Sequence, residues 1–378
     1  MSEGWAEAAL ARALDCVAAR LARPGYPHVT EGGRWVTSTD GFWTGGFWIG
    51  LCWAGYEERH DGRFRTAAEQ ALGPFLGRAT EPHNHDLGMM FCPSAVKGFR
   101  LTRQPHYREA ALRAASSLAS QLNEKGRFIP GWGFFGGEDW SGAVLVDTLM
   151  TLPLLLWAAA ETGEGHFRDV ALAHGGTSLA FHFRADGSTA HVYRFDPQSG
   201  VPLGPSTYQG KSPTSCWSRG QAWAIAACAV LGRLGAGARY LQAAERAAGY
   251  YLEHLPANRL PPWDFDASGP HEPIDSSAGA IASYGLLVLG QDQPSFWQAG
   301  AVCLRALTEA AQAPPGHEAI LLHATADLPH GIGIDESTVY GDYFFVKALQ
   351  ALLHKRLARS YIRPTEPPGP QSTKEDGR

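Results

Sequence analysis

The sequence predicts an all-α (α/α)6 barrel, a ring of six helical hairpins with one layer of helices inside another. Three observations support this fold. Apolar residues recur with i, i+3, i+4 spacing, which is typical of helices and not of strands. The first helix of each predicted hairpin is apolar almost all round, whereas the second is Ala-rich with a charged face, as inner and outer helices should be. The aromatic residues at the turns are unequally spaced, which disfavours a regular repeat array.

Five hairpins are predicted in order along the chain, and each turns at a Gly- or Pro-containing segment just before an aromatic residue. They cover residues 46–76, 94–122, 149–176, 220–255 and 280–310, with turn aromatics Phe64, Tyr107, Phe167, Tyr240 and Trp297. Two further helices are predicted at about 3–21 and 339–355. Pairing of this first helix with this last one supplies the sixth hairpin and closes the ring, so that no ends need capping as in a solenoid.

We expect residues 1–358 to form a single catalytic domain and the polar, Pro-rich segment 359–378 to be disordered. The turns within hairpins are short, whereas the connections that lead into the inner helices are long. These connections cover about 22–42, 79–86, 123–142, 184–216, 257–274 and 314–338. Long loops on a rigid scaffold are where binding and catalysis concentrate, so the functional site is expected among them.

Composition excludes several classes of protein. With 44% hydrophobic and 18% charged residues, the chain is not a disordered protein. A net charge of −5, without any long Lys/Arg run, argues against nucleic acid as a partner. The six cysteines form no CxxC pair, which favours free thiols over disulfides or a zinc site. Neither a signal peptide nor a membrane-spanning stretch is recognised, so we expect a cytoplasmic protein without a membrane partner.

Two acids are placed where connections meet inner helices. Asp147 lies in the apolar run AVLVDTLMTLP, where loss of water should raise its pKa and suit it to donate a proton. Asp86 follows His85 in a more polar segment and is expected to stay ionised. Two carboxyl groups whose environments separate their pKa values are typical of acid/base catalysis. The alternative for each acid is a helix N-cap.

Aromatic and cationic residues in the connections suit an acidic sugar. Six tryptophans lie there, and they either stack on sugar rings or pack the loops against the ring: Trp35, Trp43, Trp132, Trp140, Trp217 and Trp263. The segment 191–223 brings together His191, Gln209, Lys211 and Arg219 as a candidate positive pocket, although Arg219 is equally suited to a buried salt bridge. Asp275 is better interpreted as a helix cap, and Asp342 as a loop anchor.

Cofactor signals are absent from the sequence. The triplet His83-x-His85-Asp86 has ligand-like spacing, but no HExxH or Cys/His quartet accompanies it. There is also no GxxxxGK[ST], no GxGxxG after a strand and no GxSxG. We therefore expect neither a metal nor a nucleotide cofactor, and no serine-hydrolase mechanism.

Taken together and in order, the motifs resemble those of the unsaturated glucuronyl hydrolases, glycoside hydrolase family 88. The resemblance covers about residues 35–355. It rests on FWTGGFW (42–48), HDLGMMFCPS (85–94), GWG (131–133), VDTLMTLPLLLWAAAETG (146–163), HVYRFDP (191–197), TYQGKSPTSCWSRGQAWA (207–224), PPWDFDA (261–267), EPIDSSAGAIAS (272–283) and GDYFF (341–345). A departure is Asn84, which stands where many members are expected to have His.

The resemblance implies an (α/α)6 barrel that works without a metal. It implies release of a Δ4,5-unsaturated glucuronic acid from the non-reducing end of oligosaccharides made by polysaccharide lyases, by hydration of the C4=C5 bond. By resemblance, Asp147 matches the general acid/base and Asp86 its partner carboxylate. The matched substrate-binding positions are Trp43, His85, Trp132, His191, Gln209, Arg219 and Trp223, and Lys211 is a further cation near them.

Three alternative functions remain at this stage. The nearest is an unsaturated rhamnogalacturonyl hydrolase on the same barrel, whose relatives depend on one central Asp and not on a pair. A sugar epimerase would need paired histidines on the inner helices, and no such pair stands out. A non-catalytic oligosaccharide-binding protein would keep the tryptophans but has no need of an acid in an apolar run.

Overall fold

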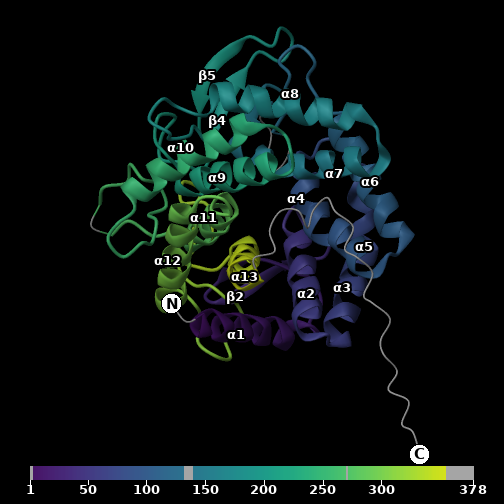
Figure 1. The fold of residues 1–378 in the computed structure, drawn as a ribbon, viewed down its shortest axis with the longest axis vertical. Coiled ribbons are helices and arrows are strands. Elements are labelled where there is room, and N and C mark those ends of the chain that lie inside the picture. Colours follow the sequence, from purple (N-terminus) through teal and green to yellow (C-terminus); the bar gives the residue numbers. More distant parts are fainter. Residues whose placement is uncertain (1–2, 132–138, 270, 355–378) are drawn as a thin grey trace, which may run out of the picture.

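The computed structural model describes residues 3–131, 139–269 and 271–354, and helices dominate this part of the chain (Figure 1). The predicted tail 359–378 lies outside the described residues. Six inner helical segments surround the axis, and an outer helix packs behind each of them. The described residues therefore form the predicted (α/α)6 barrel.

The inner ring is built from the apolar helices. Its members, in chain order, are α2 (Gly45–Arg59), α4 (Leu87–Phe91) with its continuation α5 (Lys97–Thr102), α7 (Leu152–Thr162), α9 (Ser218–Arg233), α11 (Ser276–Leu289) and α13 (Val339–His354). Every residue of α11 is buried, as expected for a helix with packed neighbours on all sides. The outer ring consists of α3 (Gly62–Phe75), α6 (Pro105–Ala119), α8 (Gly165–Phe181), α10 (Ala238–His254), α12 (Pro294–Ala310) and α1 (Gly4–Arg20).

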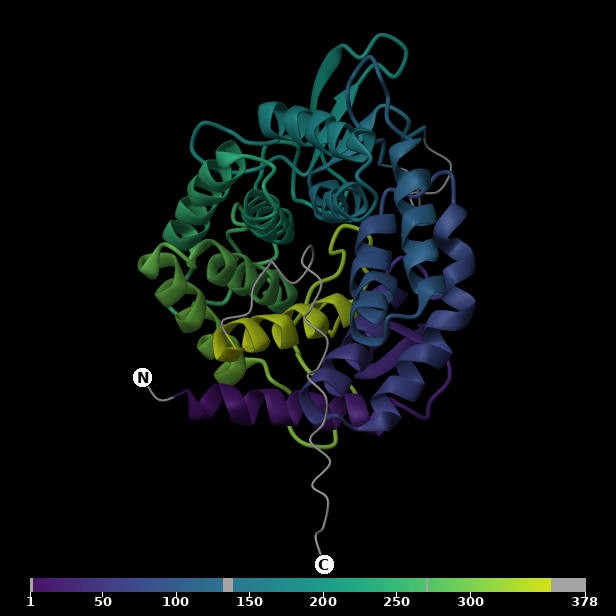
Figure 2. The same cartoon turned by 45° about the vertical axis from the view of Figure 1, so that its right-hand side comes forward.

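The ring closes through the two ends of the chain. Helix α1 packs on α13, and α13 in turn packs on both α11 and α2. Figure 2 shows α1 (purple) lying outside α13 (yellow), and α1 also contacts α2. The predicted pairing of first and last helices is confirmed.

One inner segment is less regular than predicted. Between α4 and α5, Cys92–Val96 forms a π-helical turn that contains Pro93. Proline cannot donate the backbone hydrogen bond of a regular α-helix, so the chain widens locally here. The inner segment begins at Leu87, seven residues before the hairpin predicted from residue 94, because this irregular stretch hides the helical period.

Small sheets occupy the connections and were not predicted. Strands β1 (Tyr26–Glu31) and β2 (Arg34–Ser38) are antiparallel and are joined by Gly32-Gly33, both at positive φ. Two glycines at positive φ are the preferred link of a tight hairpin. A second sheet has the order β3 (Ala143–Leu145), β4 (Val192–Phe195) and β5 (Pro202–Ser206), all antiparallel. It holds the connection before α7 against the connection before α9.

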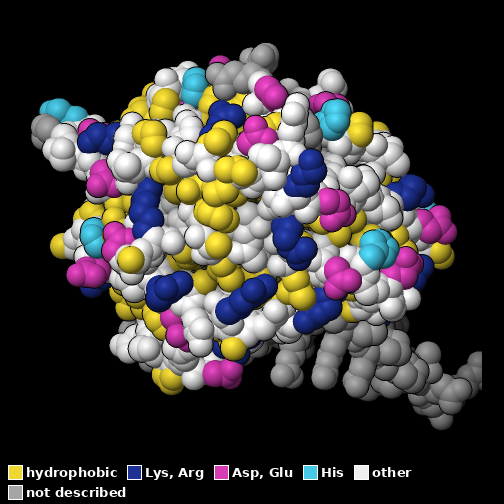
Figure 3. Space-filling model, turned by 90° about the horizontal axis from the view of Figure 1, so that it is seen from above, with side chains coloured by type: hydrophobic (Ala, Val, Ile, Leu, Met, Phe, Trp, Pro, Cys, Tyr) yellow, Lys and Arg dark blue, Asp and Glu magenta, His cyan; other side chains and the backbone are white. Residues whose placement is uncertain are grey.

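The core fills the space between the two rings. Small residues on the outer helices allow close approach to the inner ones; on α10 they are Ala243, Ala244, Ala247 and Ala248. All six cysteines lie among the described residues, and none is joined in a disulfide. On the face shown in Figure 3, a strip of hydrophobic side chains is bordered mainly by Lys and Arg side chains, and many of the acidic side chains lie further out.

Candidate active site

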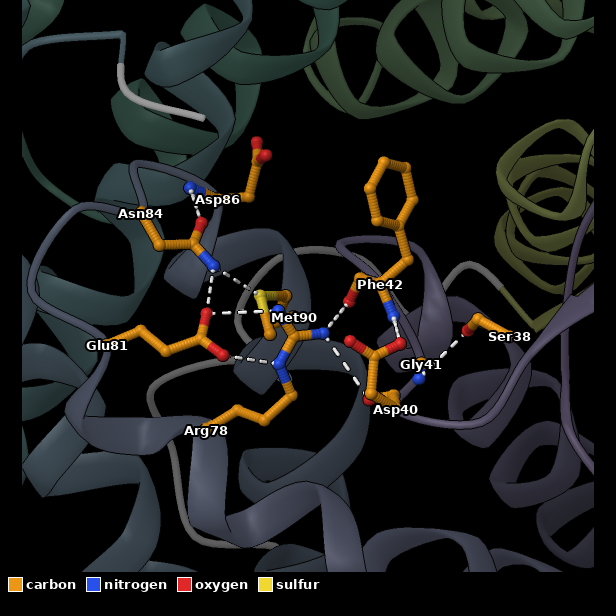
Figure 4. A network of polar contacts seen from close by, with 9 residues as sticks. All are labelled: Ser38, Asp40, Gly41, Phe42, Arg78, Glu81, Asn84, Asp86 and Met90. Carbon is orange, nitrogen blue, oxygen red and sulfur yellow. Dashed lines mark hydrogen bonds and ion pairs between the residues drawn. The ribbon is translucent and has the colours of Figure 1, made fainter. Parts of the chain in front are cut away.

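Asp86 stands directly before α4, at the end of the connection that follows η1 (Leu76–Thr80). Its side chain is only 4% exposed, and it accepts no capping hydrogen bond from the helix. The Nε2 atom of His85 lies 3.5 Å from Asp86 Oδ1. Figure 4 shows the carboxylate directed away from the polar residues behind it. The helix-cap alternative for Asp86 is therefore wrong.

Asp147 lies at the corresponding place one hairpin further on. The chain leaves β3 at Leu145 and turns into η3 (Val146–Thr151), which leads into α7. The Val146 N–H donates to the His191 carbonyl at 2.9 Å, which fixes the start of this turn. The Asp147 side chain is partly exposed and does not cap a helix, and its Oδ1 is buried with no hydrogen-bond partner among the described residues. The hydrogen-bonding capacity of this oxygen is thus left unused by the described residues.

Gly88 brings the two acidic segments together. Its N–H donates to Thr151 Oγ1 at 2.6 Å, which links the start of α4 to the end of η3. A Cβ atom at position 88 would lie 2.2 Å from the Thr151 carbonyl oxygen, far inside van der Waals contact. Only glycine permits this approach. The close packing of these backbones places Asp86 and Asp147 in one electrostatic environment.

Burial dominates the titration of both acids. It raises the pKa of Asp86 to about 7, against a smaller downward effect of Arg78. It also raises the pKa of Asp147 to about 6, while His85 lowers that pKa and Asp86 raises it. The expected separation of the two pKa values is not seen, because burial raises the pKa of Asp86 as well as that of Asp147. The two carboxyl groups form a coupled pair that holds a proton near neutral pH.

His191 supplies a hydrogen-bond donor. Its Nδ1 accepts from the backbone N–H groups of Tyr208 (3.2 Å) and Gln209 (3.3 Å). Burial lowers the pKa of the ring to about 3, so the imidazole is neutral and its proton is on Nε2. That Nε2 is buried and has no partner among the described residues. The ring packs against Trp217, with centroids 4.4 Å apart.

Arg219 lies at the start of α9 but is already neutralised. Its Nη1 donates to Asp275 at 2.5 Å and to the Thr325 carbonyl at 2.6 Å, and its Nη2 donates to the Ala326 carbonyl. Its guanidinium also lies 4.6 Å from the Trp217 ring centroid. The salt-bridge alternative is the arrangement observed. Arg219 therefore holds the connection before α13 in place at the site and does not present a free positive charge.

The aromatic residues predicted to bind substrate differ in how deeply they are buried. Trp43 is partly buried and stacks on Tyr340, with centroids 5.3 Å apart and an interplanar angle of 23°. Trp223 is only 2% exposed and packs edge-on against Phe344, so it forms the wall behind the site. Trp132 lies outside the described residues.

Two predicted polar residues contact the protein itself. The side-chain amide of Gln209 donates to the Ala326 carbonyl at 2.9 Å, the same carbonyl that Arg219 contacts. The Lys211 ammonium donates to the Asp266 carbonyl at 2.6 Å on an exposed part of the connection before α11. Gln209 thus belongs with Arg219, whereas Lys211 anchors a loop.

No group of three His, Cys, Asp or Glu side chains in the described ranges is arranged to hold a metal ion. Among the same residues, no helix combines the length and the apolar character that crossing a membrane requires.

The comparison with known families is decisive. A family model described as Glycosyl Hydrolase Family 88 matches residues 26–253, more than half of the chain. The chain belongs to glycoside hydrolase family 88. It is therefore a glycosidase, and the epimerase and non-catalytic alternatives are set aside, as is the rhamnogalacturonyl hydrolase, which belongs to a related family.

Named relatives in family 88 cover nearly the whole chain. An unsaturated glucuronyl hydrolase of Bacillus sp. (strain GL1) is 33% identical over 368 residues, which are 92% of this chain and 96% of the relative. An unsaturated chondroitin disaccharide hydrolase of Streptococcus pyogenes serotype M1 is 33% identical over 325 residues, 82% and 80% of the two chains. A solved Asp-to-Asn variant named UGL, with dGlcA-Glc-Rha-Glc, has a TM-score of 0.87 at 32% identity and covers 91% of this chain and 96% of that one.

Two features of this family 88 site were missed by the sequence analysis. The Tyr340 ring stacks on Trp43, and its centroid lies 5.3 Å from the Arg219 guanidinium carbon. Its place in the aromatic run VYGDYFF at the start of the last inner helix could have indicated it. The carbonyls of Thr325 and Ala326 carry no residue-type signal, because any residue presents the same backbone oxygen.

The tryptophans of the connections mostly pack and do not protrude. Trp140, Trp217 and Trp263 are buried, and the Trp35 indole donates to the Glu318 carbonyl at 2.8 Å. For these three buried residues the packing alternative is the arrangement observed, because the loops have apolar cores of their own. Trp43 is the partly buried tryptophan that remains a candidate for sugar stacking.

Proposed function

We propose that this family 88 enzyme releases Δ4,5-unsaturated glucuronic acid from the non-reducing end of oligosaccharides that polysaccharide lyases have produced. The observation that carries the proposal is the pair of acids at the starts of two adjacent inner segments, the buried Asp86 and the partly exposed Asp147. Neither caps a helix, and loss of water raises the pKa of both. The names of the relatives support the substrate, since they act on unsaturated glucuronyl and chondroitin disaccharide substrates.

The proposed reaction is hydration of the C4=C5 bond, an enol ether conjugated to a carboxylate. Asp147 gives its proton to C4, and the positive charge that develops at C5 is shared with the ring oxygen. A water molecule then adds to C5 and gives a proton to the Asp147 carboxylate. That proton regenerates the acid. The C5 hemiketal opens to a ketone by breaking its bond to the ring oxygen, and the hemiacetal so formed at C1 passes its hydroxyl proton to the departing sugar oxygen and collapses to an aldehyde. An ordinary glycosidase would instead displace the leaving group at C1.

The roles of the two acids follow from their surroundings. Asp147 is the partly exposed one, and its Oδ1 has no hydrogen-bond partner among the described residues, so it can reach the sugar. Asp86 is more deeply buried, and its negative charge raises the pKa of Asp147. Asp86 thereby helps Asp147 to keep its proton, and its carboxylate is suited to accept hydrogen bonds from sugar hydroxyls.

The other residues bind the unsaturated sugar. The His191 Nε2–H is a neutral donor for a sugar oxygen, and Trp43 offers a ring face for the apolar side of the sugar. Gln209 and Arg219 shape the pocket through the carbonyl of Ala326. Because Asp275 neutralises Arg219, recognition of the substrate carboxylate relies on hydrogen bonds more than on a net positive charge.

The test is the loss of ultraviolet absorbance of the conjugated alkene over time. The substrates are unsaturated disaccharides derived from glycosaminoglycans, gellan, xanthan and ulvan, with a rhamnogalacturonan fragment as comparison. Asp147→Asn should lower kcat by about 10²–10⁴-fold, the usual contribution of a general acid. Asp139→Asn, at an exposed Asp in the connection that leads toward Asp147, is the matched control and should turn over normally.

Either of two results overturns the proposal. Folded wild-type protein that consumes no glucuronyl substrate contradicts the substrate class. Near-normal turnover by folded Asp147→Asn contradicts the role of that residue.

A further inference from the structure

A chain of hydrogen bonds lies behind Asp86 and reaches it through the backbone (Figure 4). Arg78 Nε donates to Glu81 Oε1 at 2.5 Å, and Arg78 Nη2 donates to Glu81 Oε2 at 3.0 Å. Glu81 Oε2 also accepts from the Asn84 amide at 2.6 Å. Asn84 Oδ1 in turn accepts from the Asp86 N–H at 2.8 Å. The position of Asp86 is thus tied to a guanidinium that does not contact its carboxylate.

The same guanidinium also holds the loop that carries Trp43. Arg78 Nη1 donates to the carbonyl of Phe42 and, at 3.4 Å, to that of Asp40. Phe42 has a φ of 45°, an unfavourable value for a residue with a side chain, so its conformation depends on contacts of this kind. The Asp40 carboxylate supports the turn by accepting from the Phe42 N–H at 3.0 Å. Arg78 therefore joins two connections that are distant in sequence.

Asn84 links Glu81 to Asp86 through a single side chain. It is 6% exposed, and its amide donates to Glu81 while its carbonyl oxygen accepts from Asp86. A side chain must carry both a donor and an acceptor at this distance to make these two contacts. Aspartate would set a second carboxylate against Glu81, and alanine would leave the Asp86 N–H without its acceptor.

We propose that Arg78, Glu81 and Asn84 form a positioning network that fixes Asp86 and Trp43 relative to each other at the substrate. These three residues act through Asp86 and Trp43 and are not catalytic residues themselves. The proposal rests on the function proposed above, because it assigns the network to that reaction.

The network has an electrostatic effect as well as a geometric one. Arg78 is the charge that lowers the pKa of Asp86 against the effect of burial. The other groups that act on the coupled pair are His85 and Arg219, which lower the pKa of Asp147. Removing Arg78 should therefore shift the titration of the pair upward, whereas Lys at position 78 should restore the charge but not the forked geometry.

The experiment compares Arg78→Gln and Arg78→Lys with the matched control Arg65→Gln. Arg65 pairs with Glu69 on the surface of α3, the helix that directly precedes the network in the chain. We measure kcat, KM and their pH dependence on an unsaturated disaccharide. Arg78→Gln should lower kcat about tenfold or more, because small displacements in an active site are costly. It should also move the basic limb of the pH profile upward by about half a unit.

Rescue by lysine separates the two effects. Arg78→Lys should return the pH profile toward that of the wild type while kcat stays low, because a single ammonium cannot hold Glu81 and the Phe42 carbonyl in the same forked arrangement. Arg65→Gln should change neither quantity. A pH profile and kcat that Arg78→Gln shares with Arg65→Gln would overturn the proposal.

A second readout does not depend on turnover. The carbon-13 signal of the Asp86 side-chain carboxyl, assigned by its disappearance in Asp86→Asn, is titrated in wild type and in Arg78→Gln. An upward shift supports the network even if the wild type acts on none of the sugars, in which case the proposed function alone fails. An unchanged titration overturns the network. If Arg78→Gln does not fold, Asn84→Asp takes its place, since it keeps the Arg78–Glu81 pair. The kinetic pH profile and the titration of the Asp86 carboxyl then test the network in that variant.

Discussion

Two pairs of acids occupy equivalent places in the barrel but have different surroundings. Asp86 and Asp147 stand before α4 and α7, and Asp275 and Asp342 stand before or within the start of α11 and α13. Asp275 caps α11 through the Ser277 N–H at 3.0 Å and also pairs with Arg219. The Asp342 oxygens accept from the N–H groups of Ile320 and Leu321 at 3.0 and 2.8 Å. Neither Asp86 nor Asp147 caps its helix.

The difference shows that burial does not identify a catalytic acid. Burial raises the pKa of Asp342 to about 7, as high as that of Asp86. What separates the two groups is hydrogen bonding: both oxygens of Asp342 are occupied by backbone donors that hold a loop, whereas Asp147 keeps a buried oxygen without a partner among the described residues. An acid whose oxygens are occupied by the protein serves the fold, and one that is left open serves a ligand.

The largest expected difference is in stability. Asp275→Asn leaves the buried Arg219 without its charge partner, so the free energy of unfolding should fall by about 3–5 kcal/mol. Asp147→Asn should leave stability at pH 7 unchanged or higher, because it removes a carboxylate that burial disfavours. Urea unfolding of both variants and wild type at pH 7 measures this. Equal losses in the two variants would contradict the distinction between the two pairs.

A smaller effect is expected in the pH dependence of stability. Burial holds the pKa of Asp86 near 7 in the folded protein, above the ordinary value of 3.8. The contribution of Asp86 to the free energy of unfolding is therefore fully present below about pH 4 and is lost as the pH rises through 7. Asp86→Asn should therefore match wild type near pH 4 and be more stable at pH 8, by on the order of a few kcal/mol. Thermal unfolding from pH 4 to pH 8 checks this, and a constant difference across the range would count against it.

The smallest effect concerns the spacing of the acids. Gly88→Ala places a methyl group against Thr151 and should lower the free energy of unfolding by about 1–3 kcal/mol, with a loss of turnover as the two acids separate. Gly249→Ala on α10 is the control: its added Cβ meets nothing within 4 Å, so the helix should gain about 0.5–1 kcal/mol. The free energy of unfolding and kcat of both variants test this prediction. Normal turnover in Gly88→Ala would show that the spacing of the acids tolerates more change than we expect.

The sequence was informative about the barrel because helical periodicity records local burial. The helix predicted at 339–355 is observed at Val339–His354, and that predicted at 3–21 at Gly4–Arg20. The β1–β2 hairpin was missed although Gly32-Gly33 between two β-branched and aromatic runs is a hairpin signal. The π-helical turn at Cys92–Val96 escaped detection because its period differs from that of an α-helix.

The sequence predicted which residues lie in the site but not their pKa values or their ion-pair partners. Asp86 and Asp147 were found from their place before inner helices. That burial raises the pKa of Asp86 as well as that of Asp147 was not predicted, because desolvation depends on the three-dimensional surroundings and not on the polarity of neighbours in sequence. The neutralisation of Arg219 by Asp275 joins residues 56 positions apart, which a single sequence does not reveal. For the same reason the link from Arg78 to Phe42 was not foreseen.

The packing of α1 on α13 has a consequence for biosynthesis. Within this barrel, α1 is synthesised first and finds its inner partner only when α13 has followed. Until then α2 and α11 each lack a neighbour, and the growing chain exposes two apolar edges that could bind other chains. Translation speed and chaperone protection should therefore matter most for the final helix, and a truncation within α13 should harm folding more than one of equal length within a connection.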